Sequence, residues 1–391
     1  MSKAQSDKTP SVAILVETST SWGRQVVTGI LNYDRQHGPW HLFIEPRGME
    51  EHIAAPSGWA GNGVIARVGH PHVLAELQKL KCPVVNVSGI NLPGNPFPQV
   101  TTNLHASGRL AAEYFLERGF RHCGYFSLRG LEYVAAHQSA FAETLQRAGA
   151  ECSIYSVPPR HGAEPNWNLD QSHLAAWLSG LPKPVGILSW NASGSREILY
   201  AAQEAGLLVP EDVAVLSGTD DDLFCKAARI SLSGIRPSAE QIGYQAAMAL
   251  DSMMRGKASP RKSILLPPLG ITTRQSTDTL AIQDPALLKA VRFIRANAAR
   301  SSLRVGEVVS HAGLSRRMLE VRFSTQLQRA PAQEIRRVHL ERARELLEQT
   351  DLSIPDVAEA SGFASPERLA TVFRKEMGRS PLRYRKEVRT C

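Results

Sequence analysis

The stretch "VAEASGFASPERLATVFRKEMGRSP" (Val357 to Pro381) decides the fold of the C-terminal part, because an earlier stretch repeats its spacing. That stretch is "VVSHAGLSRRMLEVRFSTQLQRAP" (Val308 to Pro331). Each copy has a Gly five residues after its first Val, then a Leu, a Phe four residues later, and a Pro eight residues after the Phe. The second copy differs by one extra residue, Ala364. Two copies with a period of about 50 residues argue against a solenoid.

Each copy predicts a helix, a tight turn and a second helix. Gly313 and Gly362 suit the left-handed residue that ends a helix, and Ser315 and Ser365 stand where the next helix would be capped. A single copy could be an ordinary helical hairpin. Two copies with the same spacing indicate a pair of helix-turn-helix units. One long helix is predicted between them, with apolar positions at Ile335, Val338, Leu340, Leu346 and Leu347, and a cap for the following helix at Ser353.

This pattern resembles the DNA-binding domain of the AraC/XylS family, over roughly residues 286–388. The most diagnostic part is "LLEQTDLSIPDVAEASGFASPERLATVFRKEMGRSPLRYR". The resemblance implies that the second helix of each unit lies in a major groove. The DNA-reading residues it implies are Arg316, Arg317, Glu320 and Val321 in the first copy, and Glu367, Arg368 and Thr371 in the second.

The charge distribution points to the same partner without the family. Residues 285–391 contain 21 Lys and Arg against 12 Asp and Glu, whereas the preceding 284 residues contain 24 against 25. Since phosphate contacts supply most non-specific DNA affinity, a basic block confined to one domain is an electrostatic footprint for nucleic acid. Arg outnumbers Lys in the block by 18 to 3, which suits bidentate contacts to phosphate and guanine.

The composition of the whole chain limits its class. The 391 residues are 43% hydrophobic and 21% charged, with no apolar run of membrane-spanning length and no signal-peptide pattern at the start. Five scattered cysteines without a C-x-x-C pair indicate reduced thiols in the cytoplasm and no metal site. We expect no cofactor. "GNGVIA" (61–66) does not count as a dinucleotide fingerprint, because its glycines precede a strand instead of following one.

Short apolar runs alternate with amphipathic stretches over about 250 residues. Strands are expected near 11–17, 41–46, 61–67, 83–89, 122–128, 152–158, 185–190 and 213–218, with helices between most of them. Strand–helix alternation indicates doubly wound parallel sheets, and this length fits two in tandem. The fold class is therefore α/β plus all-α: a two-lobed doubly wound part followed by an all-helical domain.

The α/β part resembles LacI/GalR regulators and periplasmic sugar-binding proteins, and the resemblance implies that it is a ligand sensor. "EAGLLVPEDVAVLSGTDD" (204–221), "LSGIRPSAEQIGYQAA" (232–247) and "NLHASGRLAAEYFLERGFRHCGYF" (103–126) carry the resemblance. We assign residues 11–275 to this sensor, 276–285 to a linker and 286–391 to the helical domain. A LacI-like sensor followed by an AraC-type reader is similar to the XylR-type regulators of D-xylose. "RQVVTGI", "IGYQAA" and the junction sequence support that closer match.

Ligands in doubly wound folds bind beyond the carboxyl ends of the strands, where this sequence places groups suited to sugars. The resemblance puts a sugar contact at Asp220, and next at Asn191. His137 stands where relatives often have an Arg, and Asn103 stands where Asp is usual, which leaves the exact sugar open. The complete expected set is Asp220, Asn191, Trp190, Arg24, Trp22, Asn103 and His137.

The sequence thus predicts a cytoplasmic, sugar-responsive transcription regulator, with D-xylose as effector and activation of pentose catabolic genes. Operator DNA, a second copy of the chain and RNA polymerase are the expected partners. The alternative is a regulator of the same architecture that responds to another monosaccharide or to a non-sugar ligand. A transport-type binding protein with an appended domain fits poorly with the basic C-terminal block. An enzyme fits poorly too, since the sequence offers no catalytic constellation.

Overall fold

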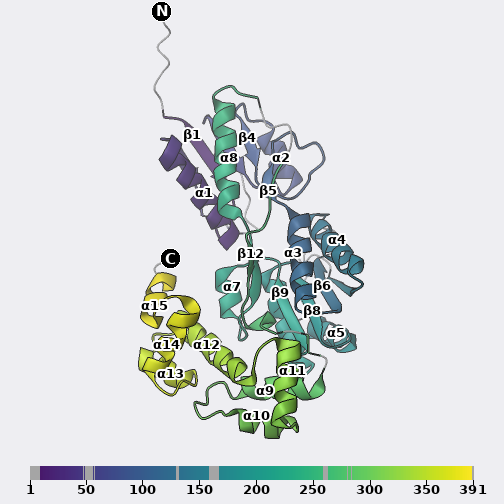
Figure 1. Ribbon diagram of the computed structural model, residues 1–391. Helices are drawn as coiled ribbons and strands as arrows, with labels where there is room; N and C mark the ends of the chain where they lie inside the picture. The colour runs from purple at the N-terminus through teal and green to yellow at the C-terminus, as the bar shows by residue number, and fades with distance from the viewer. Residues whose placement is uncertain are drawn as a thin grey trace, which may run out of the picture. The chain divides into compact units, whose positions relative to one another are not determined.

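The computed structural model describes residues 9–46, 48, 56, 58–128, 132–157, 167–258, 263–279, 281–282 and 284–389. It consists of two compact units, Met1–Thr279 and Leu280–Cys391 (Figure 1). Within the described part, no helix is long and apolar enough to cross a bilayer.

Unit 1 contains two lobes, each built on a twisted sheet. Lobe 1 has a parallel four-stranded sheet in the order β2-β1-β3-β4. Its strands are β1 (Ser11–Leu15), β2 (His41–Ile44), β3 (Gly63–Ala66) and β4 (Val84–Asn86). Its helices are α1 (Ser21–His37), α2 (Pro71–Leu77) and α8 (Ala239–Met254).

The two faces of the lobe 1 sheet are covered by different helices, as strand alternation requires. Val12 and Ile14 of β1 pack with α1 and α8, whereas Ala13 and Leu15 share a core with α2. Helices α1 and α8 cross closely, which Figure 1 shows beside β1. A Cβ at Gly29 would lie 1.9 Å from the Glu240 carbonyl oxygen, so the crossing requires a glycine there.

Lobe 2 has a six-stranded sheet in the order β12-β10-β9-β8-β6-β7, parallel except for β12 against β10. The strands are β6 (His122–Leu128), β7 (Glu151–Val157), β8 (Val185–Ser189), β9 (Val213–Ser217), β10 (Ser233–Arg236) and β12 (Gly270–Thr272). The helices are α3 (Leu104–Glu117), α4 (Glu132–Arg147), α5 (Trp167–Gly180), α6 (Ala192–Glu204) and α7 (Asp222–Ala227), followed by the short 3-10 helix η1 (Gln275–Thr277). Buried side chains of α5 and α6 share one core with β8 and β9.

The chain passes between the lobes three times. It crosses from β4 to α3 through β5 (Val100–Thr102), from β10 to α8, and from α8 to β12 through β11 (Ile264–Leu266). Strands β5 and β11 pair in parallel, and the Asn103 backbone N–H donates to the Leu266 carbonyl at 2.8 Å. The two-lobed, doubly wound fold expected from the alternation of strands and helices is confirmed.

Unit 2 is all-helical in its described part. Its helices are α9 (Pro285–Ala296), α10 (Val305–Ala312), α11 (Arg316–Leu327), α12 (Pro331–Gln349), α13 (Ile354–Ala360), α14 (Pro366–Met377) and α15 (Pro381–Arg389). The long α12 joins two small cores: Ile335 belongs to the core around Leu319 and Phe323, and Leu347 belongs to the core around Leu369 and Phe373.

The predicted caps of both repeats are confirmed. Gly313 and Gly362 have φ values of 68° and 78°, in the left-handed region. The hydroxyl of Ser315 accepts from the Met318 N–H at 3.2 Å, and that of Ser365 accepts from the Arg368 N–H at 3.3 Å. Ser353 caps α13 in the same way, through the Asp356 N–H. The repeated spacing therefore encodes two helix-turn-helix units that share one linking helix.

The boundary between the units falls close to the segment that the sequence assigns to a linker. Two of its residues, Ser276 and Thr277, are fully buried in unit 1. The Ser276 hydroxyl donates to the Val215 carbonyl of β9 at 2.6 Å, and Thr277 bonds to the hydroxyls of Ser233 and Tyr114. The chain after β12 is therefore part of the lobe 2 fold up to about this point.

Candidate functional site

A cleft of about 300 Å³ lies between the two lobes of unit 1, with residues of both lobes in its walls. The cleft lies at the carboxyl ends of the strands, because the segments after β1, β3, β8 and β9 all contain residues that line the cleft. From lobe 1 these include Trp22 and Arg67; from lobe 2 they include Tyr133, His137, Trp190, Asn191, Asp220, Asp221 and Phe224. The cleft thus combines aromatic faces with a few polar groups, as small-molecule sites do.

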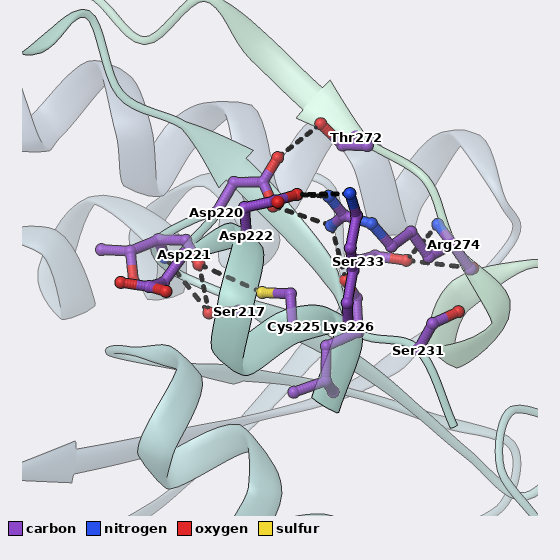
Figure 2. Close-up of polar contacts among 12 residues, drawn as sticks. Ser217, Asp220, Asp221, Asp222, Cys225, Lys226, Ser231, Ser233, Thr272 and Arg274 are labelled. Carbon is purple, nitrogen blue, oxygen red and sulfur yellow. Dashed lines mark hydrogen bonds and ion pairs between the residues drawn. The ribbon is translucent and has the colours of Figure 1, made fainter. Parts of the chain in front are cut away.

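Asp220 stands at the end of β9, and both of its carboxylate oxygens are engaged. Oδ1 accepts from Arg274 Nη1 at 2.7 Å, and Oδ2 accepts from the Thr272 hydroxyl at 2.6 Å. Figure 2 shows these two partners approaching Asp220 from β12 and the segment after it. Gly218 makes room for this turn, because a Cβ there would lie 2.4 Å from the Trp190 carbonyl oxygen.

Arg274 is the buried centre of this cluster. Its side chain is 9% exposed and that of Asp220 is 11% exposed. The same nitrogen, Nη1, also donates to the Leu232 carbonyl at 2.8 Å, and Nη2 lies 3.9 Å from Asp222. The charge of Asp220 is therefore compensated within the fold. A carboxylate has about four lone-pair sites, so Asp220 still has acceptor capacity for the hydroxyl of a ligand.

Asn191 and Trp190 follow β8. The Asn191 side-chain oxygen accepts from the Gly194 N–H at 2.8 Å and caps α6, so its amide nitrogen is the group left for a ligand. Trp190 lies edge-on to Tyr133 and to His137, with ring centroids 5.1 and 5.3 Å apart. The three rings form an aromatic wall on the lobe 2 side of the cleft.

His137 lies at the base of this wall and is fully buried. Its Nδ1 is 2.7 Å from the Tyr125 hydroxyl, and its Nε2 is 3.1 Å from the Ser107 hydroxyl. Burial lowers the pKa of His137 to about 3, so the imidazole is neutral at physiological pH. Both ring nitrogens of His137 already have hydroxyl partners, so neither is left to bond a ligand. His137 instead packs against Trp190 and bonds to Ser107.

Two other expected site residues are placed outside the lining of this cleft. Arg24 is exposed, and its Nη1 donates to the carbonyls of Thr18 and Ser19, both at 2.9 Å. Asn103 caps α3 by accepting from the Ala106 N–H at 2.9 Å. Of the expected set, the cleft brings together Trp22, His137, Trp190, Asn191 and Asp220.

Several residues of the cleft are not in the expected set, among them Arg67, Tyr133, Asp221 and Phe224. Arg67 directly follows β3, and the rule that ligands bind after strand ends could have found it. Asp221 caps α7, and its Oδ2 also accepts from the Ser21 N–H of α1 at 3.2 Å. This hydrogen bond joins lobe 2 to lobe 1 at the edge of the cleft.

The described residues contain no group of three or more His, Cys, Asp or Glu that could hold a metal ion. Cys82, Cys123, Cys152 and Cys225 are free thiols. Burial raises the pKa of Cys225, beside the Asp220 cluster, to about 12. A protonated, buried thiol is a poor nucleophile and a poor metal ligand.

A second candidate surface lies on unit 2, on the outer faces of α11 and α14. All seven expected DNA-reading residues are exposed, while Leu319, Phe323, Leu369 and Phe373 face inward on the same helices. Arg316 Nε pairs with Glu320 Oε1 at 3.0 Å, one helical turn on, and Val321 is 57% exposed. Two exposed helices with cationic residues in their first turns have the form of recognition helices.

Comparison with protein families divides the chain into three matched parts. Residues 11–104 match the family model of the XylR N-terminal domain, residues 112–277 that of a periplasmic binding protein-like domain, and residues 308–387 that of a helix-turn-helix domain. The architecture expected from the sequence is therefore confirmed.

Similar proteins match this chain over nearly its whole length and theirs. The chain is 29% identical over 381 residues to the "Xylose operon regulatory protein" of Haemophilus influenzae, covering 96% of this chain and 97% of the relative. The protein of the same name from Escherichia coli K12 is also 29% identical, with 96% of each chain covered. The solved structure titled "structure of xylose-binding transcription activator xylR" superposes with a TM-score of 0.77 at 28% identity, covering 97% of this chain and 98% of the other. These relatives are regulators, as expected here, and not enzymes.

Proposed function

Because the chain is a transcription regulator of the XylR-type architecture, we propose that D-xylose switches it and that it activates pentose catabolic genes. The observation that carries this proposal is the combination of an inter-lobe cleft suited to a small sugar with two exposed helix-turn-helix faces in one chain. The names of the relatives, which refer to xylose, support the choice of effector.

The chemistry of the cleft supports an uncharged sugar. Trp22, Tyr133 and Trp190 offer aromatic faces to the C–H patches of a sugar ring, and Asn191 offers an amide N–H. The cleft carboxylate of Asp220 is paired with Arg274, and the guanidinium of Arg67 is paired with Glu17 at 2.7 Å. Neither of these two groups offers an uncompensated charge to a charged ligand, whereas hydroxyls can bond to their remaining acceptor and donor sites.

Cleft closure provides a mechanism for the response. A ligand that touches both lobes binds the closed form better than the open form, and so shifts the population toward it. The Ser21–Asp221 hydrogen bond shows where the lobes meet when they are close. The shift then changes DNA binding by unit 2 in a homodimer, with one recognition helix in each of two successive major grooves per chain.

The DNA-reading residues proposed for this are Arg316, Arg317, Glu320, Val321, Glu367, Arg368 and Thr371. The homodimer, the contact with RNA polymerase and a location in the cytoplasm also belong to the proposal. The basic charge of the C-terminal part supports the nucleic-acid partner.

The test is DNA affinity with and without sugar. Duplexes selected by the full chain from a randomised pool would be titrated by fluorescence anisotropy, with D-xylose, L-arabinose, D-ribose or D-glucose present. We expect D-xylose to change the Kd by about tenfold, within the usual range of allosteric coupling. A Kd that responds instead to another sugar would support the alternative regulator, and a Kd that responds to none would contradict a sugar-responsive switch.

A further inference from the structure

Arg67 is a charged group in the lobe 1 wall of the cleft. It directly follows β3, and its side chain is 26% exposed. Its Nη1 lies 2.7 Å from Oε1 of Glu17, whose side chain is only 7% exposed. The two residues are 50 positions apart, and the pairing of β1 with β3 brings them together.

Glu17 restrains the position of Arg67. Its second carboxylate oxygen, Oε2, is buried and has no hydrogen-bond partner among the described residues. Removing Arg67 would leave a buried carboxylate without compensation, which is costly. The guanidinium is therefore held at the cleft wall instead of extending into solvent.

Two aromatic side chains, Trp22 and Tyr133, lie near the Arg67 guanidinium. Its guanidinium carbon lies 5.6 Å from the centroid of the Trp22 ring, within cation–π range. The hydroxyl of Tyr133, in lobe 2, interacts electrostatically with both charges. Burial raises the pKa of Tyr133, the positive charge of Arg67 lowers it, and the negative charge of Glu17 raises it. Arg67 thus lies where the lobe 1 and lobe 2 walls face each other.

Most hydrogen-bond donors of this guanidinium remain available. An arginine side chain has five N–H donors in a planar fork. In the described part of the chain, the only hydrogen bond of the Arg67 guanidinium is the one from Nη1 to Glu17. The Nε and Nη2 donors can therefore bind a pair of oxygen atoms on a ligand in the cleft.

We infer that Arg67, oriented by Glu17 and Trp22, is a specificity-determining effector contact that donates to two neighbouring hydroxyl oxygens of an uncharged sugar. This inference rests on the proposed sugar-responsive function and names the lobe 1 side of its site. The Arg67–Glu17 pair is neutral as a whole, which favours hydroxyl oxygens over a carboxylate. A sugar that lacks two neighbouring hydroxyl oxygens on the same edge of its ring can accept only one of the two hydrogen bonds from Arg67.

The test is calorimetric titration of the full chain and its variants with D-xylose and with D-glucuronate, which resembles D-xylose with a carboxylate at C5. Arg67→Met keeps an aliphatic side chain over Trp22 but removes the donors, and should weaken D-xylose binding by roughly tenfold to a hundredfold. Arg67→Lys keeps the charge but not the planar fork of donors, and its affinity for D-xylose should lie between those of the parent and Arg67→Met. The control, Arg109→Met, removes an arginine that is 63% exposed on α3 and should bind like the parent.

The outcomes separate this inference from the proposed function. If the parent binds D-xylose and Arg67→Met binds it equally well, the inference is overturned while the function stands. If the parent prefers D-glucuronate and Arg67→Met removes that preference, Arg67 is an anion contact and the uncharged-sugar assignment is overturned. If the parent binds neither, the proposed function fails and the inference fails with it. If Arg67→Met does not fold, the Glu17→Gln/Arg67→Met pair, which leaves no buried charge, gives the same comparison.

Discussion

Arg274 Nη1 lies 2.7 Å from Asp220 Oδ1, and both side chains are almost entirely buried where Asp220 lines the cleft. The expected sugar contact therefore already carries an internal counter-charge. Arg274 comes just before η1, whose Ser276 and Thr277 are buried in lobe 2. Arg274, which compensates the charge of Asp220, is thus adjacent in sequence to η1, the last described helix of unit 1.

This ion pair predicts a large stability effect. Arg274→Met leaves Asp220 buried and uncompensated, and should lower the free energy of unfolding of unit 1 by about 3–5 kcal/mol. The Asp220→Asn/Arg274→Met double variant should recover part of that loss. Urea denaturation of the full chain measures both, with Arg109→Met as the exposed control. An Arg274→Met variant as stable as the parent would show that the pair is not needed to hold the fold.

His137 predicts how stability depends on pH. Its pKa in the folded chain, about 3, lies below the ordinary value of 6.5, so the unfolded chain binds the proton first as pH falls. Stability is therefore lost below about pH 6.5 and continues to fall toward pH 3. The contribution between pH 6.5 and pH 5.5 is about 1 kcal/mol.

The His137→Gln variant should be less stable than the parent at neutral pH but should lose less stability on acidification. Thermal melting of the full chain at several pH values measures the two slopes. His105→Gln, which removes a histidine at an exposed position of α3, is the matched control. Parallel pH profiles for the parent and His137→Gln would contradict a neutral, buried imidazole.

The two turn glycines predict a matched comparison. Both have positive φ, but the space around them differs: a Cβ at Gly313 meets nothing within 4 Å, whereas one at Gly362 would lie 2.5 Å from the Ala298 carbonyl oxygen. Gly313→Ala should cost about 1 kcal/mol, from backbone conformation alone. Gly362→Ala should cost clearly more. Amide hydrogen exchange of α13 and α14 peptides, compared with α10 and α11 peptides, measures each locally, and equal costs would refute the difference in packing.

The outer helix faces predict how DNA binding changes. Arg317→Ala and Arg368→Ala should each weaken binding to a selected duplex, by about 1–3 kcal/mol if the side chain contacts a base. If it contacts phosphate, the slope of log affinity against log salt should fall by about one. Fluorescence anisotropy over a salt series separates the two cases. Neither change should follow Arg109→Ala on unit 1, and unchanged affinity in both helix variants would remove these faces from the interface.

The sequence predicts the helical unit best because its signals are local. The helix caps, the turn glycines and the inward Leu–Phe pair each depend on residues within one or two helical turns. The repeated spacing, with Phe323 in the first copy and Phe373 in the second, therefore predicts the position of each of these features. In unit 1 the alternation of strands and helices predicts the sheets, but the short strands β5, β10, β11 and β12 lack a pattern of their own. Strands β5 and β11 pair where the chain crosses between the lobes, β12 is the edge strand of the second sheet, and β10 lies between β12 and β9.

The site was predictable only in part, since its electrostatics depend on residues distant in the sequence. Asp220 could be placed at the end of a strand, but its partners Thr272 and Arg274 lie 52 and 54 positions away. In the same way, the hydrogen bonds of the two His137 nitrogens to Tyr125 and Ser107 depend on how α4, β6 and α3 pack together. Arg24 and Asn103 follow strands as expected, yet they are used by the local turns.

The most direct test of the central claim is a calorimetric titration of the purified full chain with D-xylose, L-arabinose, D-ribose and D-glucose, repeated with Asp220→Asn. Our account predicts that D-xylose binds at one site per chain and that Asp220→Asn, which loses the charge of the acceptor beside the cleft, binds at least about tenfold more weakly. Tight D-xylose binding that is unchanged in Asp220→Asn would contradict the cleft assignment. The absence of binding by all four sugars would contradict the proposal that a monosaccharide is the effector.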